Sequence, residues 1–97
     1  MNASSTSELV EVLHRTRELL ARPSSDFAWS HWVNQEDALR EFDSLTLQIE
    51  VGDSSRRREL ELLFAPTGSI QEVSINSGWA DEFLELADRF DSLIKRV

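Results

Sequence analysis

His31 is the side chain in this sequence that is best suited to acid–base chemistry. It lies between Trp29 and Trp32, and Asp26 precedes it by a few positions. Imidazole changes its charge close to neutral pH, and a nearby carboxylate would orient it for proton transfer. A small enzyme or ligand-binding protein with its site around Trp29, His31 and Trp32 is therefore one hypothesis. We favour a packed, hydrogen-bonded histidine, because the sequence sets up no catalytic partner for it.

The connecting segment of residues 23–33 is unusually aromatic, with three large rings within six positions. Such rings either fill an edge of the hydrophobic core or form an exposed contact surface for a partner, where tryptophan is enriched. A small domain needs its aromatic side chains for burial, so we favour the first interpretation. The candidate residues of this aromatic loop are Phe27, Trp29, His31 and Trp32.

The sequence offers no pattern for a metal or a cofactor. Its only histidines are His14 and His31, and it has no cysteine, which excludes a Cys/His zinc site and a disulfide framework. The acids of residues 36–43 are dense, but this run lacks the glycine and the alternate spacing of a calcium loop. The three glycines form no phosphate-binding fingerprint. We therefore predict no cofactor, no metal and no catalytic residue.

Charge is the strongest compositional signal. Eighteen acidic residues against ten basic ones give a net charge of −8, and residues 34–53 hold six acids and only Arg40. This charge opposes binding to nucleic acid and to anionic membranes, and it steers the chain towards a basic protein. We expect a non-catalytic protein-binding or regulatory module that recognises a basic partner. The candidate partner-binding residues are Glu36, Glu41, Glu85 and Asp88.

The expected compartment is the cytoplasm, and a soluble protein is predicted. The first residues have no basic stretch followed by an apolar one, and no apolar run approaches the length of a membrane span. The length of 97 residues predicts a single domain over residues 1–97, in which residues 1–4 are disordered.

Three helices are predicted from apolar spacing and end signals. The first covers about residues 6–21 and stops before Pro23. The second covers residues 35–51, with Asn34 as its N-cap and Gly52 at its end. The last follows Trp79, and its apolar stripe recurs every three or four residues. That stripe consists of Trp79, Phe83, Leu86, Phe90, Leu93 and Val97.

The segment between the second and last helices predicts an antiparallel β-hairpin. Its apolar residues alternate with polar ones on both sides of a turn at residues 66–69. The predicted inner face consists of Leu60, Leu62, Phe64, Val73 and Ile75, packed on the last helix. The fold class is therefore α+β, a small single domain with the order α-α-β-β-α. A competing signal is the capping-box pattern from Ser69 to Glu72, which indicates a short helix instead.

Two further expectations depend on this hairpin. Residues 45–51 also alternate, so a three-stranded meander that includes them is an alternative to the long second helix. If the second helix is long, the two-stranded sheet has two unpaired edges, and a homodimer would cover one of them.

Overall fold

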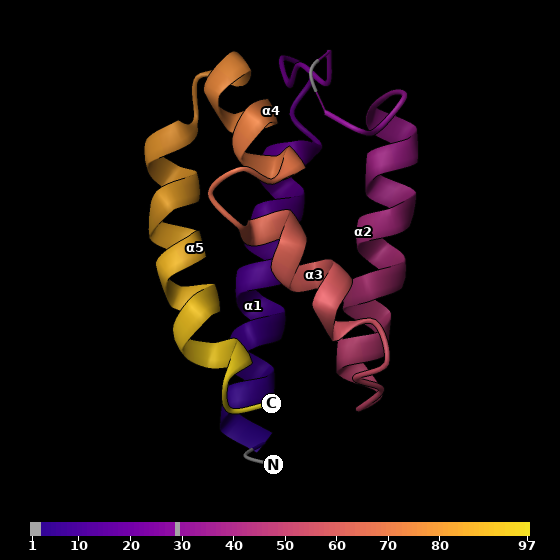
Figure 1. Cartoon of the computed structure of the whole chain (residues 1–97), viewed down its shortest axis with the longest axis vertical. Coiled ribbons are helices and arrows are strands. Elements are labelled where there is room, and N and C mark those ends of the chain that lie inside the picture. Colours follow the sequence, from indigo (N-terminus) through magenta and orange to yellow (C-terminus); the bar gives the residue numbers. More distant parts are fainter. Residues whose placement is uncertain (1–2, 29) are drawn as a thin grey trace.

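The computed structural model describes residues 3–28 and 30–97, and every regular element in these ranges is a helix. The predicted α+β class is therefore wrong, and so are the hairpin and the three-stranded meander. The helices are α1 (Ala3–Leu20), α2 (Gln35–Glu50), α3 (Arg57–Phe64), α4 (Ser69–Ser77) and α5 (Ala80–Ile94) (Figure 1).

The first predicted strand is the helix α3. Its buried residues are Leu60, Leu63 and Phe64, a spacing of three and four positions that lies on one side of a helix. Leu62, which the strand pattern places in the core, is 53% exposed. Apolar and polar residues do alternate in this segment, but the side chain in the core is that of Leu63 and not that of Leu62.

The second predicted strand is the helix α4. Ile70, Val73 and Ser74 are buried at helical spacing, whereas Ile75 is 57% exposed. The helix begins after Gly68 and ends at Gly78, whose φ of 85° is the left-handed conformation that glycine adopts readily. The competing capping-box signal thus indicated the right type of element, although the β-branched residues outweighed it in the prediction.

The long second helix is confirmed. Asn34 Oδ1 accepts a hydrogen bond from the N–H of Asp37 at 2.9 Å, and the helix continues to Glu50. Gly52 follows with a φ of 80°, as a helix C-terminus often requires. The alternating residues 45–51 are therefore helical, and Leu47 is 59% exposed as its place off the apolar stripe requires.

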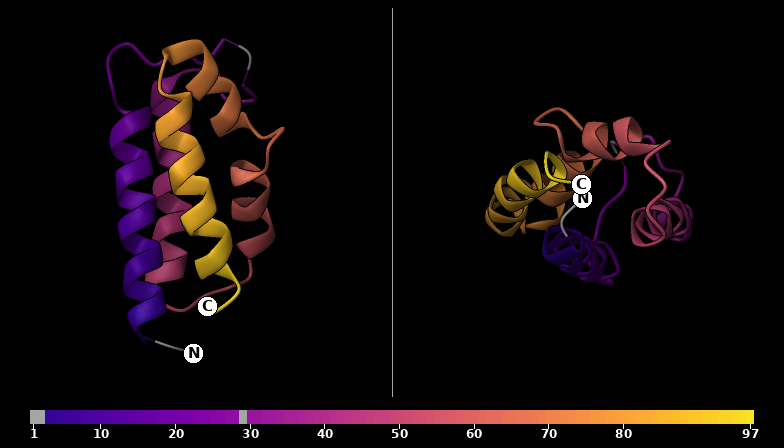
Figure 2. Two further views of the ribbon diagram at one scale, coloured as in Figure 1. Left: turned by 90° about the vertical axis from the view of Figure 1, so that its left-hand side faces the viewer. Right: turned by 90° about the horizontal axis from the view of Figure 1, so that it is seen from below.

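The helices form two layers along the long axis of a 37 × 23 × 20 Å body. In Figure 1, α1 lies behind, α2 and α5 flank it, and the shorter α3 and α4 cross the front. The view from below in Figure 2 shows the helices as a ring around the core. The helix α1 contacts both α2 and α5, whereas α2 and α5 lie on opposite sides of the molecule. This separation decides which charged residues share a surface.

Phe64 lies at the centre of the core. Its ring stacks on Phe90 with centroids 4.1 Å apart, and it lies 6.0 Å from the ring of Phe83 and 6.3 Å from that of Phe42. All four rings are at most 3% exposed. The expected packing of this segment on the last helix is therefore right for Phe64, although the segment is a helix.

The first helix begins earlier than predicted, at Ala3, and ends at Leu20. The prediction of disorder for residues 1 and 2 falls outside the described residues. Arg17 joins α1 to α2, since its Nε donates a hydrogen bond of 2.6 Å to Asp43 Oδ1. This hydrogen bond and the charge of Asp43 raise the pKa of Arg17.

The fold bears on two sequence-based expectations. The homodimer was expected from unpaired strand edges, and no strand exists within residues 3–28 and 30–97, so that reason no longer applies. None of the helices in the described part of the chain has the length and apolar character needed to cross a membrane.

Candidate functional site

The structure joins His31 to two residues that are distant in the sequence. His31 Nδ1 lies 2.5 Å from Ser69 Oγ, and His31 Nε2 lies 3.1 Å from Glu41 Oε2. The backbone N–H of His31 also donates to Ser69 Oγ at 3.4 Å. We call Ser69, His31 and Glu41 the serine relay, because a hydroxyl, an imidazole and a carboxylate follow one another within hydrogen-bond distance.

A buried tryptophan fixes the carboxylate of this relay. Trp32 is 3% exposed, and its Nε1–H donates to Glu41 Oε2 at 2.6 Å. Its ring also lies beside the imidazole of His31, with centroids 4.7 Å apart. Because a buried indole N–H needs an acceptor, this contact holds Glu41 in place, and the same oxygen, Oε2, faces His31.

The loop that carries His31 is tied to helices on both of its sides. Near its start, the N–H of Asp26 donates to Ser77 Oγ at 2.7 Å, and Ser25 Oγ accepts from Trp79 Nε1 at 3.3 Å. At its end, Gln35 Nε2 donates to the carbonyl oxygens of Leu20 and Arg22. These hydrogen bonds fix the ends of the loop to the end of α1 and to the junction of α4 and α5, and the contacts of His31 with Ser69 join its middle to the start of α4.

The hydrogen bonds select one tautomer of the neutral imidazole. An ionised Glu41 accepts only, so His31 Nε2 carries the proton and donates it. Nδ1 then has a free lone pair, to which the Ser69 hydroxyl donates. The relay is therefore polarised in one direction, from the serine through the imidazole to the carboxylate.

A hollow of about 400 Å³ opens beside the relay. It lies between α2, the end of α3 and the turn that leads into α4. Its apolar lining comes from Leu62, Leu63 and Ala65. The polar lining comes from His31, Glu41, Glu59, Thr67, Gly68 and Ser69. The side chain of His31 is 52% exposed, so solvent and small molecules reach the imidazole.

The other residues of the predicted aromatic loop have structural positions. Phe27 and Trp32 are buried, 9% and 3% exposed, and their rings meet edge to face at 6.2 Å. Asp26 accepts a hydrogen bond from the N–H of Ala28 instead of meeting His31. Trp29 lies outside the described residues. The core-filling interpretation therefore holds for the two described rings, and the carboxylate beside His31 is that of Glu41.

The four candidate partner-binding acids do not share one surface. Glu36 and Glu41 lie on α2, where Glu36 pairs with Arg40 at 3.2 Å and Glu41 belongs to the serine relay. Glu85 and Asp88 lie on α5, on the other side of α1. The structure thus separates them into two pairs, of which the α2 pair already has partners.

The helix α5 carries a run of acids without cationic partners. Among the described residues, no Lys, Arg or His nitrogen lies within 4.0 Å of these carboxylates. The residues, which we call the α5 acidic stripe, are Asp81, Glu85, Asp88 and Asp91. Their spacing of four, three and three positions places them on one side of the helix, opposite the buried stripe around Phe90. This arrangement of acids on one side of a helix can be read from their spacing in the sequence alone.

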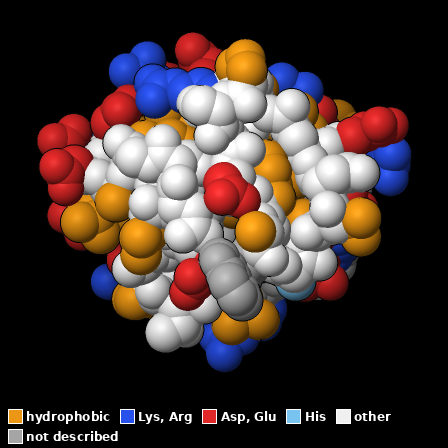
Figure 3. All heavy atoms as spheres, turned by 90° about the horizontal axis from the view of Figure 1, so that it is seen from above, with side chains coloured by type: hydrophobic (Ala, Val, Ile, Leu, Met, Phe, Trp, Pro, Cys, Tyr) orange, Lys and Arg blue, Asp and Glu red, His pale blue; other side chains and the backbone are white. Residues whose placement is uncertain are grey.

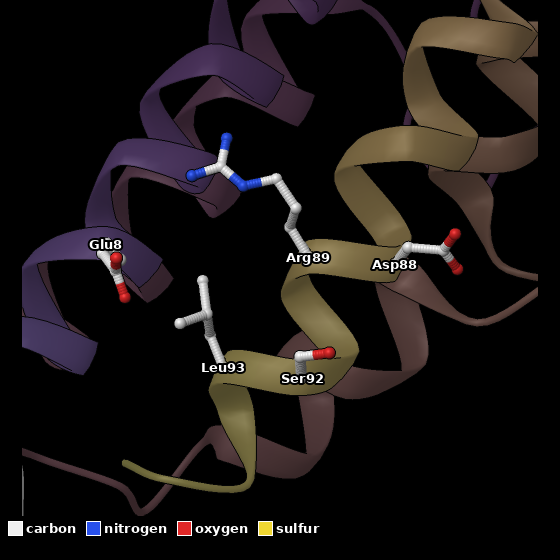
Figure 4. A pocket seen from close by; sticks show the side chains of 5 residues that line it. All are labelled: Glu8, Asp88, Arg89, Ser92 and Leu93. Atoms are coloured by element: carbon white, nitrogen blue, oxygen red, sulfur yellow. The ribbon is translucent and has the colours of Figure 1, made fainter.

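The figures show the environment of this stripe. Viewed from above in Figure 3, acidic side chains gather at the left-hand edge, on the side where α5 lies in Figure 1. Acidic and basic groups lie next to each other on the opposite side, that of α2. In Figure 4, Arg89 points towards α1, whereas Asp88 points away from it. The basic residue of this helix segment is therefore turned away from Asp88.

Ser69 is the member of the relay that sequence reasoning missed. It lies 38 positions after His31, in a segment that the strand prediction assigned to a turn. Nothing local in the sequence links the two residues, since the contact depends on the path of the loop and on the helical start of α4. Glu41 was selected for its charge alone, not as a partner of His31.

No metal centre is formed by three or more His, Asp or Glu side chains within the described ranges. Comparison with models of known protein families, with curated proteins and with solved structures finds no match to this chain.

Proposed function

We propose that this protein is a protein-binding module that recognises a basic partner through the α5 acidic stripe. The observation that carries the proposal is the row of four exposed carboxylates on α5 that form no ion pair within 4.0 Å with any described basic residue. Unpaired charges on one face generate a field that attracts the opposite charge and raises the rate of encounter.

The distribution of ion pairs supports α5 over α2. On α2, Arg40 pairs with Glu36 and Arg17 pairs with Asp43. On α3, arginines likewise pair with Glu59 and Glu61. Of the ten basic residues, four (Arg17, Arg40, Arg56 and Arg57) thus pair with acids of α2 and α3, and Arg22 pairs with Glu82 on α5. The four acids of the α5 acidic stripe have no such pair among the described residues.

An exposed leucine gives the stripe an apolar contact point. Leu84 is 54% exposed and lies three positions after Asp81 and four before Asp88. Residues at these spacings are neighbours on a helix surface. A partner segment with basic side chains around an apolar residue would match this face, because charges steer the encounter and the apolar contact adds affinity.

The test compares two double variants that remove the same charge from different helices. E85Q/D88N removes two carboxylates from α5, and E36Q/E50Q removes two from exposed positions of α2. Each variant is used as bait in a native extract of the source cells at low and high salt, and captured proteins are quantified by mass spectrometry. We expect a basic protein whose capture by wild type falls as salt rises.

The α5 variant should bind that protein roughly 2- to 30-fold more weakly, since exposed ion pairs contribute about 0.2–1 kcal/mol each. The α2 variant should bind it as wild type does. Equal weakening by both variants would show that only net charge matters. Capture that is insensitive to salt would show that the acidic stripe does not carry the interaction.

A further inference from the structure

We propose that Ser69 is an activated nucleophile that reacts with small neutral acyl esters, with His31 as its general base and Glu41 as the residue that positions His31. This reactivity goes beyond partner binding and stands on different residues, since the serine relay lies at the start of α4 and the acidic stripe lies along α5.

The geometry of the relay matches what acyl transfer requires. A serine nucleophile needs a base within about 2.6–3.2 Å and a third group that orients that base. Ser69 Oγ lies 2.5 Å from His31 Nδ1, and Glu41 Oε2 lies 3.1 Å from His31 Nε2. These contacts join three separate parts of the chain and converge on a single imidazole.

The imidazole is turned around relative to the usual serine, histidine and aspartate arrangement, in which Nε2 faces the serine. Here Nδ1 faces Ser69 and Nε2 faces Glu41. Either ring nitrogen accepts a proton when the other carries one, so the base function is preserved. Trp32 keeps the carboxylate in place by donating to the same oxygen, Oε2.

The position of Ser69 also suits the charge that develops during acyl transfer. Ser69 is the first residue of α4, a helix of nine residues. The first N–H groups of a helix have no carbonyl partner within it, and the helix dipole favours negative charge at this end. An oxyanion formed on an ester bound to Ser69 would lie near these donors, as such intermediates require.

The hollow indicates the class of substrate. Its volume of about 400 Å³ is that of a site for a small molecule, and Leu62, Leu63 and Ala65 supply apolar contacts for an acyl chain. Glu41 and Glu59 line the same hollow and would repel an anionic substrate. We therefore infer a short, uncharged acyl ester.

The reaction balances without any further reagent except water. Ser69 Oγ bonds to the carbonyl carbon of the ester while its proton moves to His31 Nδ1. The bond from that carbon to the alcohol oxygen breaks, and the alcohol leaves with the proton from His31. Water then attacks the acyl carbon on Ser69 while His31 Nδ1 takes a proton from it. The bond from that carbon to Ser69 Oγ breaks, His31 returns the proton to Oγ, and the carboxylic acid leaves.

The first experiment uses an alkyl fluorophosphonate, which forms an oxygen–phosphorus bond with an activated serine and releases fluoride. Intact-mass measurement gives the labelling rate, and peptide mapping gives the modified residue. We expect a single adduct on Ser69 that is absent from S69A. S92A is the matched control, because Ser92 is an exposed serine on α5, and its labelling should equal that of wild type.

H31A should lower the labelling rate by about 100-fold, the lower end of what a general base contributes. Circular dichroism and thermal unfolding identify any variant that fails to fold. Labelling of a folded wild-type protein at residues other than Ser69, or equal labelling in folded wild type and H31A, would overturn the proposal.

A second pair of variants tests the site without relying on serine reactivity. The chain has no cysteine, so S69C and S92C each contain a single thiol. Iodoacetamide should alkylate S69C at least about 10-fold faster than S92C, because the imidazole draws the proton from the thiol. The advantage should disappear in S69C/H31A. A thiol at position 69 that reacts no faster than that of S92C, in folded proteins, would overturn the proposal.

The role of Glu41 is tested by the tautomer of His31, which a merely structural contribution would not change. Two-bond proton–nitrogen NMR correlations of neutral His31 should show the proton on Nε2 in wild type. E41A should give a mixture of both tautomers together with slower labelling of Ser69. An unchanged tautomer in folded E41A would show that Glu41 does not position the imidazole.

Discussion

Leu62 and Leu63 are neighbours of the same type in opposite environments, and replacing each by alanine tests the helical arrangement of α3. Leu63 is 5% exposed and Leu62 is 53% exposed. We expect L63A to be strongly destabilising and L62A to be nearly neutral. A β-hairpin with Leu60, Leu62 and Phe64 inside would give the reverse order, so the pair distinguishes the two folds directly.

The magnitude follows from burial. Deleting a buried leucine to alanine costs about 2–5 kcal/mol, because apolar contacts are lost and a cavity remains. At Leu62 roughly half of the side chain stays in water in the folded state, and alanine has the higher helix propensity, which offsets part of the loss. We therefore expect a cost below about 1 kcal/mol for L62A. The difference corresponds to a melting temperature at least about 4–8 °C lower for L63A than for L62A.

Urea unfolding followed by circular dichroism measures both variants in one format. Equal slopes of free energy against urea would show that the unfolded states are comparable, so that midpoints report stability. An L62A midpoint lower than that of L63A would refute the helical assignment of this segment. Equal losses in both would show that neither face of the segment is clearly exposed.

Three further predictions concern other parts of the structure. F83A should lose roughly 3–5 kcal/mol, because Phe83 is 1% exposed and packs on Phe64, and an unchanged urea midpoint would contradict the core. G68A should be destabilised by about 1–3 kcal/mol and should be labelled more slowly at Ser69, because a Cβ at Gly68 would collide with the carbonyl oxygens of Leu62 and Leu63. A G68A variant as stable as wild type would contradict this close approach. A hydrogen bond from the N–H of Ser55 lowers the pKa of Asp53 from 3.8. Wild type should therefore be more stable than D53N above pH 3.8, and this advantage should shrink as the pH falls through the lowered pKa. A stability difference that is independent of pH would contradict the hydrogen bond.

The sequence was informative wherever a helix had clear ends. Asn34 and Gly52 delimit α2, and the apolar stripe of α5 recurs over its full length, so both helices were predicted. In these segments the local signals and the burial pattern agree. Such agreement makes a prediction from one sequence dependable.

The sequence misled where two periods fit the same residues. In α3, Leu60 and Phe64 belong to both the alternating and the helical pattern, and only the burial of Leu63 over Leu62 separates them. In α4, the β-branched Val73 and Ile75 favoured a strand, but packing against neighbouring helices overrode that preference. Short segments of eight or nine residues contain too few turns to resolve this ambiguity.

The two candidate sites also differ in whether the sequence predicts them. The α5 acidic stripe follows from the spacing of its residues in the sequence, and two of its members, Glu85 and Asp88, were predicted as partner-binding residues. The serine relay depends on a loop that folds back onto α4, which no local pattern encodes. A contact between residues 31 and 69 becomes visible only when the tertiary structure is known.

The most direct test of the proposed function is to find which carboxylates touch the partner. A carbodiimide joins a carboxylate to a lysine amine without adding a spacer, so it reports only groups in contact. After reaction of wild-type protein with its captured partner, peptide mapping should place the cross-links on Asp81, Glu85, Asp88 or Asp91. Cross-links confined to Glu36 and Glu50 on α2, or a captured partner with no cross-link to α5, would contradict recognition through the α5 acidic stripe.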